Sequence, residues 1–166
     1  MSHTAVTLED LLSDFDETAA KWKQFFAANR GAAEAVTDIA NRDNIGSLVW
    51  HIYAASVRHS ERLLGEPVTD LEGTLPQKNL DSAWELQSRA AANLRRFLES
   101  TDDAALNEVF HFQTRVGGEA SASRRKICLH IFVHAIRHWA QIGSIVRQHG
   151  FPPNWPQDIL FSKAIE

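Results

Sequence analysis

The chain has 166 residues, with 17 Lys and Arg against 21 Asp and Glu, so its formal net charge is −4 with His neutral. This length suits one domain that buries a core without covalent staples. A single Cys excludes an internal disulfide and a Cys-rich zinc site. A mildly acidic chain without a basic block is a poor candidate for binding nucleic acid. Eight His beside one Cys are the unusual feature of the composition.

The N-terminal region lacks the features of a targeting segment. It has no basic start, and Asp10, Asp14 and Asp16 interrupt its Leu residues. No apolar run approaches the roughly 18–20 residues that are needed to span a bilayer. We therefore expect a cytoplasmic protein with no membrane partner, which agrees with Cys128 being reduced and buried as a small hydrophobe.

Four helices are predicted from apolar residues that recur at spacings of three and four. The first begins at Thr7, an N-cap with Asp10 three residues later. The third begins at Ser82 with Glu85 three residues later, which is the pattern of a capping box. The four predicted helices span residues 7–29, 44–64, 82–100 and 123–149.

Two connections are long for a helical bundle, residues 65–81 and residues 101–122. Within the second, residues 109–116 alternate loosely between apolar and polar side chains and meet Gly117-Gly118. This pattern predicts a short hairpin before the last helix.

The whole pattern predicts an all-α fold, a four-helix bundle with long connections. The sequence has no internal repeat and no second composition zone, so residues 1–166 are expected to form a single domain. The segment after the last helix contains Trp155 and Phe161, and we expect it to fold back onto the helices.

Three His recur at intervals of four in the last predicted helix, at His130, His134 and His138. His134 and His138 fall on the apolar seam that also contains Ile131 and Ile145. Unsatisfied polar groups on such a seam cost a few kcal/mol each. Two imidazoles at this spacing can chelate one metal ion, which would satisfy them.

His51 supplies a third imidazole from the second predicted helix. It lies one turn beyond Leu48 and one turn before Ala55, so it faces the same side as both. Together with His134 and His138 it would complete a three-His site with open positions. A cluster with a purely structural role in a homodimeric bundle remains the alternative.

The sequence lacks several familiar catalytic motifs. Residues 135–137 are Ala-Ile-Arg, so the Glu of the H-E-x-x-H metalloprotease motif is missing. A di-iron site needs two Glu-x-x-His motifs, and the chain has one, Glu108 to His111. Cys128 lies on a different face from His134, which argues against a Cys–His nucleophile, and no Gly-rich phosphate loop is present.

The His pattern resembles the DinB/YfiT-like superfamily of metalloenzymes. The resemblance rests on the His in SLVWHIYAASVRHSERLL and on H-x-x-x-H-x-x-x-H-x-x-Gln in the last helix, followed by GFPP and WPQDILF. It covers nearly the whole chain. It implies a dimeric four-helix bundle with a divalent metal ion bound by His51, His134 and His138, whereas the His at the position of His130 is usually not a ligand.

The function expected on this basis is that of a metal-dependent enzyme acting on a small molecule. With Zn²⁺ or Ni²⁺ on three neutral imidazoles, a bound water could attack an electrophile as in a hydrolase. The resemblance favours a transferase that uses a low-molecular-weight thiol, which a metal would hold as thiolate. A metal-binding or stress-response dimer without turnover is the alternative.

Two neighbours of the predicted ligands have open roles. Gln141 lies one turn after His138 and would either orient a ligand or form a hydrogen bond in the core. His130 is a candidate hydrogen-bond partner or substrate contact, an alternative ligand, or a packed residue of the helix face. Trp139 stands where the family often has Arg, which weakens any inference of an anionic substrate.

The remaining polar residues are given ordinary roles. Arg137 and Arg58 could replace the missing Arg of the family. His59 is expected to be partly buried. The residues expected at the surface are Glu34, Asp43 and Glu61, together with His3, His111 and His149.

Overall fold

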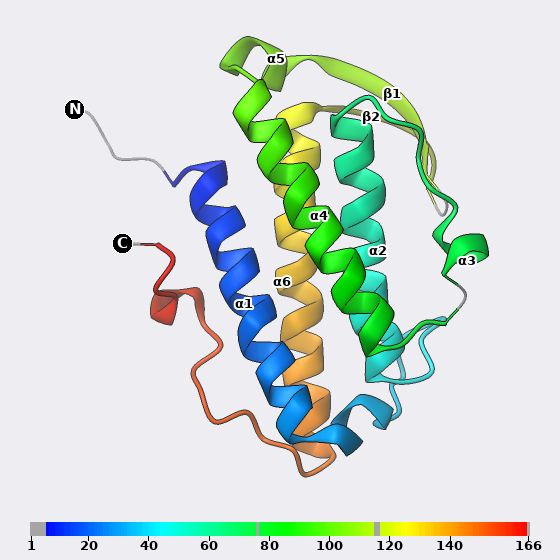
Figure 1. The fold of residues 1–166 in the computed structure, drawn as a ribbon, viewed down its shortest axis with the longest axis vertical. Coiled ribbons are helices and arrows are strands. Elements are labelled where there is room, and N and C mark those ends of the chain that lie inside the picture. Colours follow the sequence, from blue (N-terminus) through cyan, green and yellow to red (C-terminus); the bar gives the residue numbers. More distant parts are fainter. Residues whose placement is uncertain (1–5, 76, 115–116, 166) are drawn as a thin grey trace.

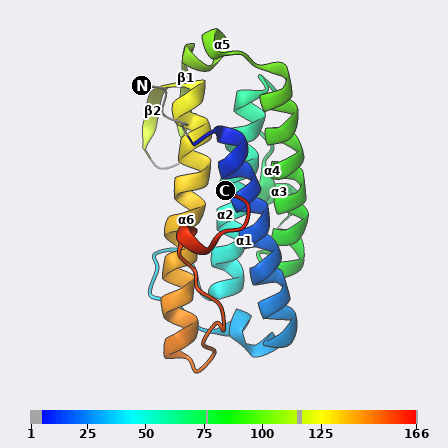
Figure 2. The same ribbon diagram turned by 90° about the vertical axis from the view of Figure 1, so that its left-hand side faces the viewer.

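Four long helices lie side by side in the computed structural model, which describes residues 6–75, 77–114 and 117–165 (Figures 1 and 2). α1 and α6 run in one direction, and α2 and α4 run in the other (Figure 1). Their bounds are α1 (Leu8–Ala28), α2 (Ile45–Leu63), α4 (Leu80–Ser100) and α6 (Arg124–Gln148).

Short elements occupy the connections. Two 3₁₀ turns and two short α-helices are η1 (Arg30–Glu34), η2 (Ile159–Phe161), α3 (Leu71–Thr74) and α5 (Asp103–Asn107). The predicted hairpin is confirmed as strands β1 (Val109–Thr114) and β2 (Gly118–Ser123). They pair antiparallel, with Val109 opposite Ser123 and Thr114 opposite Gly118. The hairpin lies beside α6 (Figure 2).

Each long helix packs against two others. α2 contacts α4 and α6, and α1 contacts the same two helices. α2 and α4 are parallel, so the chain must cross the length of the molecule between them, through the connection that contains α3 (Figure 1). The prediction of an all-α fold is thus confirmed in its coarse form, with a two-stranded sheet added. Within the described ranges, no helix is long and apolar enough to cross a membrane.

The helix N-termini confirm one predicted capping residue and correct another. Thr7 caps α1, and its hydroxyl accepts from the Asp10 N–H while the Asp10 carboxylate accepts from the Thr7 N–H. The N-cap predicted for the third helix, Ser82, is wrong by three residues. Asn79 is the N-cap of α4, and Ser82 belongs to the first turn, where its N–H donates to Asn79 Oδ1. Asn caps a helix as well as Ser does, so the earlier capping residue determines the start.

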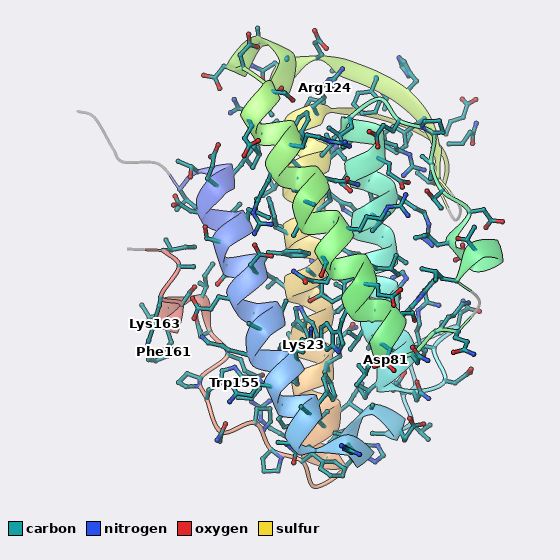
Figure 3. All side chains as sticks on the ribbon, viewed as in Figure 1. Lys23, Asp81, Arg124, Trp155, Phe161 and Lys163 are labelled. Atoms are coloured by element: carbon teal, nitrogen blue, oxygen red, sulfur yellow. The ribbon has the colours of Figure 1, made fainter. Side chains whose placement is uncertain are left out.

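Aromatic side chains fill the core between α1, α2 and α6. Trp22 and Trp139 stack with ring centroids 4.9 Å apart, and both are buried. Trp155 from the C-terminal segment lies beside α1 (Figure 3) and meets Trp22 edge-on at 5.3 Å. The segment therefore folds back as expected, but Phe161 is 54% exposed and does not join the core.

Glu61 is buried, which corrects the expectation of a surface charge, whereas Glu34 and Asp43 are exposed as expected. The Glu61 carboxylate accepts hydrogen bonds from the N–H and hydroxyl of Thr69 at 2.9 and 2.7 Å, and from Arg89 Nη2 at 2.5 Å. Helical periodicity places Glu61 correctly on α2. It does not show that the connection after α2 folds back over that side chain.

Candidate metal centre

Three imidazoles meet where α2 faces α6. His51 lies in the first half of α2, and His134 and His138 lie one turn apart in the middle of α6. The centroid of the His51 ring is 5.0 Å from those of both His134 and His138, and the latter two are 4.5 Å apart. One ring nitrogen from each residue can be chosen so that all three lie within 4.8 Å of one another.

The surrounding helices hold these rings in an apolar setting. Ile52 follows His51 on α2, and Ile131 lies one turn before His134 on α6; both are buried and belong to the hydrophobic core. All three rings are half-buried. Neutral imidazole is the form that binds a metal, and three such ligands are typical of sites that keep a position open for another molecule.

Gln141 orients one of the three rings. Its Oε1 lies 2.7 Å from Nδ1 of His138, and an amide oxygen can only accept, so Nδ1 carries the proton. The lone pair of His138 is then on Nε2. Ligating His residues in metal sites commonly donate their other N–H in this way.

Nδ1 of His134 is buried and has no hydrogen-bond partner among the described residues. A buried ring nitrogen of this kind costs free energy unless something binds there. Three converging imidazoles, one with its proton placed by Gln141 and one with an unsatisfied buried nitrogen, fit a divalent metal ion.

Arg42 also reaches the cluster, from the loop before α2. Its Nη2 lies 2.5 Å from Nδ1 of His51. The positive charge of Arg42 lowers the pKa of His51, His134 and His138, although in each case burial is the larger cause. Arg42 is therefore a cation in direct contact with the cluster.

Burial keeps these imidazoles neutral. It lowers the pKa of His51 and of His134 to about 3, and the charges of Arg42 and of the neighbouring His residues add to the effect. The pKa of His138 is lowered by burial as well, while its hydrogen bond to Gln141 acts in the opposite direction.

Two further His extend the cluster into a row. The His130 ring lies 5.5 Å from His134 and 5.0 Å from His59. His59 is partly buried, as expected, and burial lowers its pKa to about 3. His130 lies more than a helical turn from His138, outside the three-membered group, and it is exposed on one side.

The row forms one wall of a cavity of about 500 Å³ between α2, α6 and the hairpin. His51 and His134 line it from the helices, and Phe112 of β1 lines it from the hairpin. The cavity also takes in Arg58, one of the two arginines suggested by the sequence, whereas the other, Arg137, is exposed on α6.

The remaining His residues and Cys128 are not part of the three-His cluster. His111 and His149 are exposed as expected, and His3 lies outside the described residues. Cys128 is buried, which raises the pKa of its thiol to about 12 and leaves it a poor nucleophile.

Fold and cluster together define a class, a mostly helical protein with a three-His group at a helix interface that is compatible with metal binding. The sequence model of the DinB family matches residues 1–164, so the chain belongs to the DinB family. A search of curated proteins found no match.

The sequence did not predict the contact between Arg42 and His51, nor that the hairpin lines the cavity beside the three-His cluster. Arg42 lies outside every helical periodicity, and it approaches His51 because the loop is tied back by the bridge between Val36 and Asn44. A cation shortly before a His-bearing helix was the only signal, and such residues are common without any contact.

Proposed function

We propose that this DinB-family protein is a metal-dependent enzyme that binds one divalent ion, Zn²⁺ or Ni²⁺, through His51, His134 and His138 on a four-helix bundle. The observation that carries the proposal is the convergence of these three rings, whose ligand atoms lie within 4.8 Å of one another. Family membership supports it, because the match spans both helices that supply the ligands.

The protein's own groups have defined tasks in this proposal. The three imidazoles bind the ion, and Gln141 holds the proton on Nδ1 of His138 so that Nε2 faces the ion. When bound, the ion supplies Lewis-acid chemistry that favours the deprotonated form of a thiol or a water. The cavity beside His51 and His134 admits a small substrate to that position.

The reaction class proposed is transfer to a low-molecular-weight thiol, with hydrolysis as the related possibility. A thiolate would attack an electrophilic carbon, forming a carbon–sulfur bond while the leaving group departs with its electron pair. The support for a thiol is the resemblance to the family. The support for a small substrate is the size of the cavity, about 500 Å³.

The enzyme proposal is tested with the zinc- or nickel-loaded protein, 1-chloro-2,4-dinitrobenzene and a panel of small thiols. Formation of the thioether, which accompanies release of chloride, is followed by absorbance. We expect turnover with at least one thiol and its loss in His134→Ala. Turnover with no thiol and with no simple ester substrate would overturn it.

A second candidate is a metal-binding or stress-response homodimer without turnover, in the cytoplasm. It is favoured by two exposed apolar residues seven apart on α6, Leu129 and Ile136, which share a face of the helix. Light scattering after gel filtration tests the dimer. A protein that is monomeric both without metal and with metal bound would exclude this candidate.

A further inference from the structure

The cavity beside the three-His cluster has an unbalanced set of charges. Arg58, Arg62 and Lys126 line it, and its lining includes no carboxylate among the described residues. The rest of the wall is largely apolar, with Phe112 from the hairpin and Ile127 from α6 as its largest apolar side chains.

Among the described residues, Arg58 is the one of these three cations with a carboxylate partner. Its Nη2 donates to Glu72 Oε1 at 2.9 Å, and its side chain is mostly buried. This pair holds Arg58 in place at the cavity wall. Its charge is therefore largely balanced by Glu72, although Arg58 still lowers the pKa of its neighbour on the next turn of α2.

Arg62 is that neighbour, and it contacts neutral groups. Its Nη2 donates to the carbonyl oxygen of Gln113 at 3.1 Å, and Nη1 lies 3.4 Å from Nδ1 of His59. The guanidinium also lies over the Phe112 ring, 5.1 Å from its centroid. Burial and the charge of Arg58 lower the pKa of Arg62, while the negative charge of Glu61 acts in the opposite direction.

A partly buried cation stacked on an aromatic ring, at the wall of an apolar cavity, is the arrangement that binds an anion attached to an apolar group. Lys126, exposed at the first turn of α6, adds a second charge at the same cavity. The N-terminus of α6 carries positive potential as well, so an anion beside Lys126 would be stabilised by both.

We propose that this cavity binds a small amphipathic anion, a carboxylate or sulfonate joined to an apolar body, with the charge at Arg62 and Lys126 and the body against Phe112 and Ile127. The proposal rests on the proposed function, since it names the substrate class of the same site. His51 and His134 lie in the same cavity, so a ligand held there would have its reactive carbon beside the three-His cluster.

The binding test uses the full chain with its metal removed by a chelator. The probes are 8-anilinonaphthalene-1-sulfonate and N-phenyl-1-naphthylamine, which share an apolar body and differ in the sulfonate. Fluorescence titration should show saturable binding of the sulfonate. 3-Phenylpropionate should displace it, and 3-phenylpropanamide, which is uncharged, should not.

Matched variants locate the charge. We expect Arg62→Gln with Lys126→Gln to weaken sulfonate binding by about tenfold or more, the loss expected for charge-assisted hydrogen bonds, and to leave the neutral probe unaffected. Lys23→Gln with Arg30→Gln removes the same charge from exposed sites outside the cavity, on α1 and η1, and should change neither probe.

A third variant tests where the apolar part of the ligand binds. Ala55→Phe on α2 fills the cavity and should weaken both probes, with circular dichroism and thermal unfolding confirming that the variant is folded. Equal effects of the two charge-changing pairs, or sulfonate binding that survives both Ala55→Phe and the Arg62 and Lys126 changes, would overturn the proposal.

These outcomes are independent of the metal proposal, because the probes bind metal-free protein and metal content is measured separately. Metal uptake with no charge-selective probe binding would refute the anion site alone. Selective probe binding with no metal uptake would refute the proposed function and leave the anion site standing.

Discussion

Nη2 of Arg42 lies 2.5 Å from Nδ1 of His51. A guanidinium can only donate, so this contact requires a lone pair on Nδ1 and places the imidazole proton on Nε2. If a metal ion binds Nδ1, it competes with Arg42 for that lone pair. If it binds Nε2, the proton must move to Nδ1, which then repels the Arg42 donor. Either way, binding by His51 requires Arg42 to withdraw.

Replacing Arg42 should therefore strengthen metal binding. We expect Arg42→Met to bind Zn²⁺ about tenfold more tightly than the wild type, since it removes both the hydrogen bond to be broken and a nearby positive charge. Competition with a chromophoric zinc chelator measures this affinity. Arg30→Met, on the exposed surface of η1, is the control with the same charge change. Unchanged or weaker binding in Arg42→Met would show that Arg42 does not compete with the ion.

Gln141 should affect the same affinity in the opposite direction. Gln141→Leu removes the acceptor for Nδ1–H of His138, and loss of such a partner typically costs about 10- to 100-fold in metal affinity. Gln141→Glu keeps an acceptor at the same position and should bind zinc at least as tightly as the wild type. Equal affinities for the Leu and Glu variants would mean that the hydrogen bond does not orient the ligand.

The stability of the metal-free protein should fall in acid. His51, His59 and His134 have pKa values of about 3 in the folded protein, against 6.5 for an unperturbed His. Between these limits the unfolded chain takes up protons that the folded protein does not, so the free energy of unfolding decreases as pH falls from about 6.5 toward 3.

Urea denaturation at pH 7, 5.5 and 4.5, with a chelator present, measures this dependence. His59→Gln tests one contribution without touching the predicted ligands, and it should make the dependence on pH shallower. His111→Gln, on the exposed side of β1, should leave the slope unchanged. A slope that is the same in the wild type and in His59→Gln would contradict the assignment of a buried neutral imidazole.

The buried carboxylate of Glu61 should matter more for stability than an exposed ion pair. Arg89→Ala removes its charged partner and leaves the carboxylate, which is 1% exposed, with Thr69 alone. We expect a loss of about 2 kcal/mol in the free energy of unfolding. Arg96→Ala, which breaks the exposed pair with Glu66, should cost less than about 1 kcal/mol. Equal costs would show that burial of Glu61 adds nothing.

Much of the site was predictable because helical periodicity depends on local sequence. His134 and His138 share a seam with buried Ile131, and His51 shares a face with Leu48, so packing of the two apolar faces brings the three rings together. The position of Gln141 one turn beyond His138 follows from the same geometry. Helix bounds were right within a residue where the predicted cap was the true one, as at Thr7.

What could not be predicted depends on how the connections fold. Arg42 reaches His51, and Thr69 covers Glu61, through loops whose paths leave no periodic trace in the sequence. The cavity wall at Phe112 depends likewise on how the hairpin lies against α2 and α6. These contacts join elements that are distant in sequence, and they decide which charges surround the three imidazoles.

The metal content of the purified protein tests the central claim most directly. After exposure to Zn²⁺ and gel filtration, the wild type should carry about one ion per chain by mass spectrometry, since the three imidazoles form one site. His51→Ala, His134→Ala and His138→Ala should each carry far less while keeping helical circular dichroism, and His149→Ala should match the wild type. A wild type without metal, or a His134→Ala variant that keeps the full amount, would contradict the three-His site.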